Sequence, residues 1–184
     1  MSARAGRARY PTALMVALAL AGAGCEADEE HLDADPGPDG PGTIEVVGVD
    51  YAFEGVPESA AVGSGLTFRN DSDVEAHELV LVALPEGERR PVSEIVQLPP
   101  PESGPVLDNE VGVSVAAPEE EGRAVAGELT VDEPGRYALL CTMPIGADPD
   151  DVVAAASREG GPGELEDGPP HTDEGMYAEL TVEE

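Results

Sequence analysis

Four residues of this chain carry side chains that bind transition metals, and they occur in the order His77, Cys141, His171 and Met176. A thiolate, two imidazoles and a thioether form the donor set that suits copper cycling between its two oxidation states. Each of the four lies at the end of a predicted strand or on the loop before the last one. A rigid sheet with ligands at its strand ends holds a metal in nearly one geometry in both states, which favours electron transfer.

Each of the four also has an ordinary structural explanation, as a strand-end histidine bonded to a carbonyl, an inert buried thiol, a loop residue or a core methionine. Their order and spacing together favour the metal hypothesis over these separate explanations. Met143 is interpreted as packing rather than as a further ligand. His31 lies alone among carboxylates, and a metal site needs converging ligands, so it is interpreted as a bystander.

Short β-strands must position these residues. The 184 residues include 22 glycines and 18 prolines, and aromatic residues make up only 3%. Such a composition favours many turns and short strands over a helical bundle. The predicted strands cover residues 43–53, 66–70, 77–85, 111–116, 125–131, 136–141 and 176–182. Seven short strands separated by turns predict an all-β fold, an antiparallel sandwich or barrel.

Two insertions interrupt the strands. Residues 86–110 are proline-rich and predicted to be mostly irregular, with one helical turn at PVSEIV. Residues 148–158 predict a short helix, because Asp148 can cap it and Pro149 suits its first position. Residues 159–170 contain seven Gly or Pro and predict a loop. We expect the insertion from 146 to 168 to form a lid beside the metal site, resting on the stripe Val152, Val153 and Ala156.

The combination of ligand order and flanking motifs resembles the cupredoxins, the plastocyanin-like blue copper proteins. The matching segments are Val56-Pro57, Gly63-Ser-Gly65 before LTFRN, His77 after NDSDVEA, Pro134-Gly135 before Tyr137, Cys141-Thr-Met-Pro144 and His171-Thr-Asp-Glu-Gly175-Met176. The resemblance implies a cupredoxin-like Greek-key β-sandwich, with a short helix between the Cys and the second His. It also implies one type-1 copper bound by His77, Cys141, His171 and a weak axial Met176, and one-electron transfer rather than enzymatic catalysis.

The sequence departs from the cupredoxin pattern at two places. Twenty-nine residues separate Cys141 from His171, where the family places the two ligands within a few residues of each other. The chain could leave the site at Pro144 and return at Pro170 without moving either ligand, because long surface insertions cost little free energy. Glu78 follows His77, where many relatives carry an Asn that helps tie the two ligand loops. This second departure concerns the surroundings of the metal and hence its redox potential.

The first 25 residues have the pattern of a lipoprotein export signal. Three arginines precede an uncharged run, and Leu20-Ala-Gly-Ala-Gly-Cys25 resembles the lipobox of bacterial lipoproteins. We therefore expect a signal peptide at 1–24, a lipid on Cys25, an acidic Gly/Pro-rich tether at 25–42 and the cupredoxin-like domain at 43–184. The protein would be anchored on the outer face of the cell membrane. An ordinary signal peptide with an incidental cysteine is the alternative.

The charge of the chain limits its partners. With 39 acidic residues, nine arginines and no lysine, the formal net charge is −30, which excludes binding to nucleic acid or anionic lipid through charge. Solvation of an exported protein explains this acidity, and steering toward a basic redox partner is the alternative. We expect a monomer. A copper-handling or metal-free binding domain of the same fold is the competing function, and a hydrolase using Cys141 and His171 as nucleophile and base is a distant third.

Overall fold

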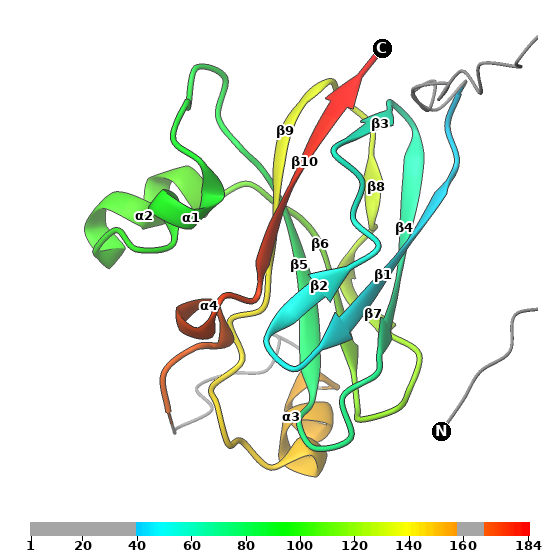
Figure 1. Ribbon diagram of the computed structural model, residues 1–184, viewed down its shortest axis with the longest axis vertical. Coiled ribbons are helices and arrows are strands. Elements are labelled where there is room, and N and C mark those ends of the chain that lie inside the picture. The colour runs from blue at the N-terminus through cyan, green and yellow to red at the C-terminus, as the bar shows by residue number, and fades with distance from the viewer. Residues whose placement is uncertain (1–39, 158–167) are drawn as a thin grey trace, which may run out of the picture. The chain divides into compact units, whose positions relative to one another are not determined.

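The computed structural model describes residues 40–157 and 168–184, and in this part of the chain the strands form two sheets (Figure 1). The four-stranded sheet has the order β2-β1-β4-β8, with β1 at Thr43–Val49, β2 at Ala52–Glu54, β4 at Ser64–Asn70 and β8 at Thr130–Val131. The six-stranded sheet has the order β3-β10-β9-β5-β6-β7, with β3 at Ser59–Ala61, β10 at Tyr177–Glu183, β9 at Gly135–Leu140, β5 at His77–Ala83, β6 at Glu110–Ala116 and β7 at Arg123–Gly127. The predicted all-β sandwich is thus confirmed.

The sheets are mixed rather than purely antiparallel. β1 and β4 run parallel, with Val46 opposite Phe68, and β10 runs parallel to β3. The other pairs of strands are antiparallel. After β2 the chain crosses to the other sheet and forms β3 there. It then returns to the first sheet as β4, which can therefore pair with β1 in the parallel direction. Residue alternation specifies which face of a strand is buried but not the partner of that strand, so the sequence did not indicate this crossover.

The core lies between the two sheets. β4 alternates buried and partly exposed residues, and its Leu66 and Phe68 meet Leu79 and Leu139 of the larger sheet in one apolar cluster. β9 is buried on both faces, because Tyr137 and Leu139 point into this core while Ala138 and Leu140 join a second cluster. Strands covered on both faces explain why HELVLVALP and RYALLC are continuous apolar runs.

The second cluster lies where the insertion between β5 and β6 packs against the larger sheet. The predicted helical turn is present as α1 (Val92–Ile95), whose two end residues are buried against Val82 and Leu140 of the sheet. Residues predicted to be irregular form α2 (Pro100–Leu107). This helix has no buried residue and carries Pro105 inside it, so it lacks the apolar periodicity by which a sequence indicates a helix.

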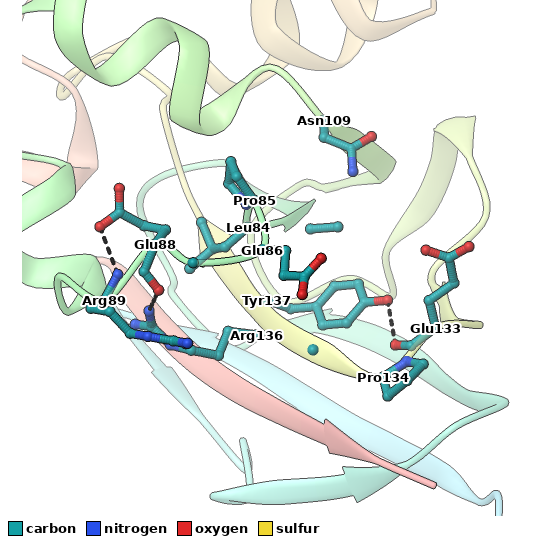
Figure 2. Close-up of a pocket in the computed structure, with 13 residues that line it drawn as sticks. Leu84, Pro85, Glu86, Glu88, Arg89, Asn109, Glu133, Pro134, Arg136 and Tyr137 are labelled. Atoms are coloured by element: carbon teal, nitrogen blue, oxygen red, sulfur yellow. Dashed lines mark hydrogen bonds between the residues drawn. The ribbon is translucent and has the colours of Figure 1, made fainter.

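Arg136 fixes this insertion to the sheet. Its guanidinium donates to the Glu179 carboxylate at 2.7 and 2.8 Å and to the carbonyl oxygens of Glu88 and Arg90 at 2.8 Å each. Figure 2 shows Arg136 beside a hollow of about 410 Å³, where Tyr137 donates to the carbonyl of the 133–134 turn. The hollow lies where β5 ends and β9 begins, which is the opposite end of these strands from His77 and Cys141.

The predicted helix before residue 158 is present as α3 (Pro149–Ala156). Asp148 caps it by accepting from the backbone N–H of Asp150 at 3.0 Å, and Pro149 occupies its first turn. Its buried face consists of Val152, Ala155 and Ala156, whereas Val153 is only half-buried. The predicted end of the helix at 158, and most of the predicted loop at 159–170, lie outside the described residues.

Two other stretches differ from the sequence expectations. The predicted strand at 43–53 is a hairpin of β1 and β2 that turns at Asp50 and Tyr51, where Tyr51 adopts a positive φ of 67°. The predicted strand at 125–131 divides into β7 and β8, which join different sheets, and Gly127 with a φ of 53° marks the break. Among the described residues, no helix is long and apolar enough to cross a membrane. The predicted signal peptide, Cys25, His31 and all but the end of the 25–42 tether lie outside these residues.

Candidate metal centre

The four candidate ligands lie at one end of the sandwich. β5 and β9 are antiparallel with Val80 opposite Leu140, so His77 at the start of β5 lies close to Cys141 just after β9. His171 opens a one-turn helix, α4 (His171–Glu174), where the sequence had indicated a loop, and α4 ends at Gly175 with a φ of 112°. Met176 follows at once, and its carbonyl accepts from the Cys141 N–H at 3.1 Å.

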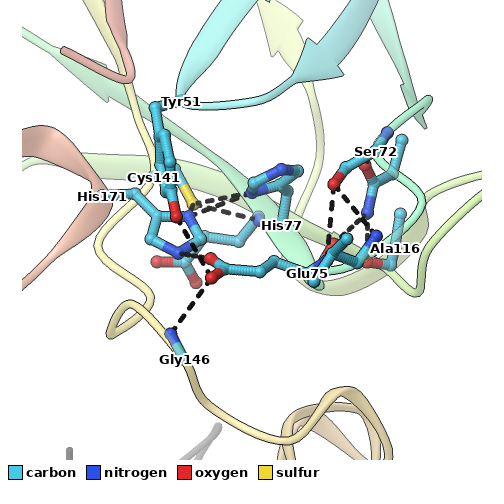
Figure 3. Close-up of polar contacts among 11 residues, drawn as sticks. Tyr51, Ser72, Glu75, His77, Ala116, Cys141, Gly146 and His171 are labelled. Atoms are coloured by element: carbon cyan, nitrogen blue, oxygen red, sulfur yellow. Dashed lines mark hydrogen bonds and ion pairs between the residues drawn. The ribbon is translucent and has the colours of Figure 1, made fainter. Parts of the chain in front are cut away.

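Three donor atoms converge at this end (Figure 3). Nδ1 of His77 lies 3.0 Å from Nδ1 of His171, and Sγ of Cys141 lies 3.3 Å from the His171 nitrogen and 4.0 Å from the His77 nitrogen. A point equidistant from these three atoms is about 2.0 Å from each, which is the length of a bond from a metal to nitrogen and slightly shorter than one to sulfur. The arrangement therefore fits a single metal ion without movement of the backbone.

The site is closed to solvent. His77 and His171 are each 1% exposed, and Cys141 and Met176 are 0% exposed. Met176 belongs to the same buried cluster as Cys141, so the fourth candidate lies in the immediate surroundings of the other three. Val152 and Ala156 of α3 complete that cluster. The described part of the insertion thus packs into the buried cluster beside the centre, together with Val113 and Val115 of β6, rather than resting outside it as a separate lid.

The long insertion leaves and returns at one point. Pro144 and Pro170 form an isolated β-bridge, and the N–H of Ile145 donates to the carbonyl of Pro169 at 2.9 Å. The His171 N–H also donates to the Met143 carbonyl at 2.9 Å. The chain therefore closes at the positions expected from the sequence, and the ligands on either side stay together.

A carboxylate orients the second histidine. Oε2 of Glu75 lies 2.7 Å from Nε2 of His171, and Oε1 accepts from the Tyr51 hydroxyl at 3.1 Å and from the Gly146 N–H at 3.2 Å (Figure 3). The Tyr51 ring meets the His171 ring edge to face, with 5.1 Å between ring centroids. A carboxylate beside Nε2 favours a proton on that nitrogen, which leaves Nδ1 free to bind a metal.

Burial keeps both imidazoles neutral. Burial, and then the neighbouring His171, lowers the pKa of His77 to about 4. Burial also lowers the pKa of His171, although the Glu75 carboxylate opposes this shift. Neutral imidazole is the form that binds metals, so both rings are ready as ligands at neutral pH.

Cys141 is a protonated thiol when no metal is present. Burial, and then the charge of Glu78, raises its pKa well above the usual range, while N–H bonds such as that of Glu78, 3.4 Å from Sγ, oppose the shift. A nucleophilic cysteine needs a lowered pKa and access to a substrate, and this buried side chain has neither. The geometry thus disfavours the hydrolase hypothesis, whereas a bound metal ion would deprotonate the thiol and use it as a ligand.

Glu78 ties the two ligand strands together. Its Oε1 accepts from both the N–H of Thr142, at 2.9 Å, and the Thr142 hydroxyl, at 2.6 Å. Because Glu78 follows His77 and Thr142 follows Cys141, these bonds fix one ligand against the other. Burial raises the pKa of Glu78, and the Thr142 bonds oppose that rise. Many relatives use an Asn at this position to link the two ligand loops. In this chain Glu78 makes the link instead.

Three residues that support the site carry no recognisable signal in the sequence, namely Glu75, Tyr51 and Asn70. The Asn70 amide donates to the carbonyls of Glu75 and Ala116, and so holds the acidic turn that precedes His77. Glu75 is one of three acids in NDSDVEA, and no local pattern distinguishes the acid that faces a ligand from those that face water. The positive φ of Tyr51 marks a constrained position, but a backbone angle is not visible in the sequence.

Comparison with known proteins gives structural neighbours only. No protein-family model and no curated protein sequence matches the chain. An auracyanin of Roseiflexus castenholzii has 22% identity and a TM-score of 0.45, with 77% of this chain and 97% of that one covered. Auracyanin A of Chloroflexus aurantiacus, a blue copper protein, has 21% identity and a TM-score of 0.42, with 78% of this chain and 100% of that one covered.

A multi-copper oxidase of Pediococcus acidilactici is a more distant neighbour, with 11% identity and a TM-score of 0.34, and with 80% of this chain and 27% of that one covered. The roles of the individual residues rest on the distances in this chain.

The bonds from Glu78 give a prediction about the stability of the metal-free protein. Glu78→Ala should lower the free energy of unfolding by about 1–3 kcal/mol, because the two Thr142 donors lose their acceptor and a small cavity forms. Glu78→Gln retains a side-chain carbonyl oxygen and should cost clearly less. Urea unfolding at neutral pH in a chelating buffer measures both. Equal losses for the two variants would show that the hydrogen bonds do not stabilise the site.

A second prediction concerns pH. The pKa of His77 is about 4 in the folded chain against 6.5 for the free side chain, so between these values the unfolded state binds more protons. The metal-free wild type should therefore lose stability relative to His77→Gln as the pH falls from about 6.5 to about 4, and the difference should level off below that. Denaturant unfolding of both proteins across this range measures it. A difference that is independent of pH would contradict the shifted pKa.

Proposed function

We propose that this protein is a one-electron carrier with a single type-1 copper, which His77, Cys141, His171 and Met176 would hold. The observation that carries the proposal is the meeting of two imidazole nitrogens and a thiol sulfur around one point about 2.0 Å from each. The fully buried methionine in the same cluster supports it. Two His and one Cys with a weak, long Met is the donor set typical of blue-copper electron-transfer sites.

In this proposal the copper, when bound, supplies a centre that gains and loses one electron. The protein holds the donors in place through the β5–β9 register, the Glu78 tie and the bridge between Pro144 and Pro170. Glu75 keeps the His171 proton on Nε2, away from the metal-binding nitrogen. The buried cluster around Cys141 excludes water, so little solvent reorganises when the charge changes. These are the properties that an electron carrier needs.

A copper-handling protein of the same fold is the second candidate. The specific observation in its favour is that all three convergent donors are buried and held by their neighbours, an arrangement that also suits tight retention of a metal. The two functions differ in the bond between copper and sulfur. A carrier holds the oxidised ion on the thiolate, whereas a protein that only stores or delivers the reduced ion has no need to do so.

An absorption spectrum separates these functions. The protein loaded with Cu²⁺ should bind one ion per chain and show an intense thiolate-to-copper band near about 600 nm. Cys141→Ser should abolish the band, whereas Met143→Leu, which changes a buried neighbour outside the ligand set, should keep it. One tightly bound copper without the band would favour the copper-handling function. Absence of copper binding would leave only a structural or binding role.

We further propose that the domain is held on the outer face of the cell membrane by a lipid on Cys25. The support is the pattern of the sequence: a basic start, an uncharged run and Leu20-Ala-Gly-Ala-Gly-Cys25, followed by an acidic tether. A carrier anchored in this way keeps its copper domain close to membrane-bound redox partners while the tether lets it turn. Such a protein would act as a monomer.

Two reciprocal variants test the anchor. Cys25→Ser should move the protein from the membrane fraction to the soluble fraction of its host and leave the copper band intact, because the substituted residue lies far along the chain from the ligands. Cys141→Ser should do the opposite, with the band lost and the protein still on the membrane. Retention of Cys25→Ser on membranes would show that another segment anchors the chain.

A further inference from the structure

A hollow of about 560 Å³ lies on the outer face of the six-stranded sheet. Strands β5, β6, β7 and β9 line it, together with Leu107 of α2. Its walls belong to two apolar clusters, because Val113 is in the same cluster as Val152 of α3 and Leu140 is in the same cluster as Ile95 of α1. α1 and α3 thus cover different ends of this face (Figure 1), and the hollow lies where the two clusters meet.

The walls of the hollow are apolar although they lie outside the core between the sheets. Val80 pairs in register with both Val113 of β6 and Leu140 of β9, so these three side chains lie on one face of the sheet. Successive residues of a strand point to opposite faces, and Leu79 and Leu139 point into the core. An outer face in contact with water alone carries polar residues at such positions. The valines and the leucine therefore suit contact with an apolar molecule in the gap between the helices.

A buried carboxylate interrupts these apolar walls. Glu78 lines the hollow and is only 3% exposed. Its Oε1 accepts from both Thr142 donors, whereas its Oε2 has no hydrogen-bond donor among the described residues. Oε2 is also not one of the polar atoms that the described structure seals from solvent without a partner. This oxygen therefore keeps an opening through which a bound molecule can donate a hydrogen bond.

The charge in the lining of the hollow is negative. Glu110, the first residue of β6, also lines it and is exposed. Arg and His residues are absent from the described lining, and neither glutamate forms an ion pair with another described residue. A positively charged donor complements a carboxylate in apolar surroundings, because a charge-assisted hydrogen bond is stronger than one between neutral groups. An anion would be repelled, and a hydrated metal ion would gain nothing from the apolar walls.

We propose that this hollow binds a small organic cation, namely a primary ammonium group on an apolar body. The ammonium donates to Oε2 of Glu78, and the body packs against Val80, Val113 and Leu140, which line the hollow. Its volume of about 560 Å³ is typical of small-molecule sites, and so are apolar walls with few polar groups. Binding makes and breaks no covalent bond and needs no metal, so the inference is independent of the proposed carrier function.

Three ligands test the two parts of this chemistry on the full-length, metal-free protein at neutral pH. Benzylammonium carries both the charge and the apolar body, benzyl alcohol carries the body alone, and methylammonium carries the charge alone. NMR titrations locate each ligand and measure its Kd, and the signals of Thr142, Val80 and Val113 should move first. Benzylammonium should bind at least about tenfold more tightly than the other two, because only it uses the carboxylate and the walls together.

Three variants assign the binding to this hollow. Glu78→Gln keeps a carbonyl oxygen for Thr142 but removes the charge, so it should weaken the binding of benzylammonium about tenfold and leave that of benzyl alcohol unchanged. Val125→Phe places a larger side chain in the lining and should weaken the binding of both. Glu54→Gln is the matched control and should change neither, because Glu54 is an exposed glutamate at the end of β2 in the other sheet.

Equal affinities of benzylammonium and benzyl alcohol for the wild type would overturn the proposal, even where Glu78→Gln fails to fold. Signals that move first on another surface would overturn it as well. A loss of affinity in Glu54→Gln as large as that in Glu78→Gln would do the same, because the net charge of the chain would then explain the binding. The copper band does not enter this test, so the carrier function and the binding site stand or fail separately.

Discussion

The central constraint on this molecule is that two neutral imidazoles and one thiol must meet within 4 Å of one another where water does not reach. Burying such groups costs free energy, and Nε2 of His77 has no hydrogen-bond partner in the described structure. A flexible chain would relieve that cost by turning the donors outward. The donors stay together because His77 and Cys141 are fixed by the β5–β9 register. A shift of one residue would move Leu79 and Leu139 out of the core between the two sheets.

Hydrogen bonds supply the precision that the sheet register alone does not give. Glu78 links the residue after His77 to the residue after Cys141, and Glu75 sets the orientation of His171. Both are acids, in a chain where acids outnumber bases by 39 to 9. A carboxylate beside a ligand favours the more positive oxidation state of a bound metal, so the Glu75 contact orients the ring and would lower the reduction potential of a copper ion held there. The same residue closes the outer side of His171.

Three features could be predicted from local patterns in the sequence. Strand-length apolar runs predicted the sandwich, and an Asp cap before a Pro predicted the helix beginning at Pro149. Soft donors at strand ends predicted the convergence of His77, Cys141 and His171. The sequence did not predict the parallel pairing of β1 with β4, because that depends on a crossover through β3 in the other sheet. It missed α2, in which no residue is fully buried and only Val106 and Leu107 pack partly against the apolar cluster.

The role of Glu75 could not be predicted from the sequence. A carboxylate two residues before a histidine contacts a different histidine 96 positions along the chain, and local patterns carry no information on such pairs.

The long insertion between Cys141 and His171 illustrates how such a site tolerates variation in loop length. Closing a longer loop costs free energy only as the logarithm of its length, so the ligands depend on how the loop ends are joined rather than on what lies between them. Here the ends are joined by the Pro144–Pro170 bridge and by the bond from His171 N–H to the Met143 carbonyl. Gly168 is part of this closure, because a Cβ at its φ of 80° would lie 2.3 Å from the Ile145 carbonyl oxygen. With the junction fixed, α3 can add buried surface beside Cys141 while the positions of the donor atoms are set elsewhere, by the sheet and by the two glutamates.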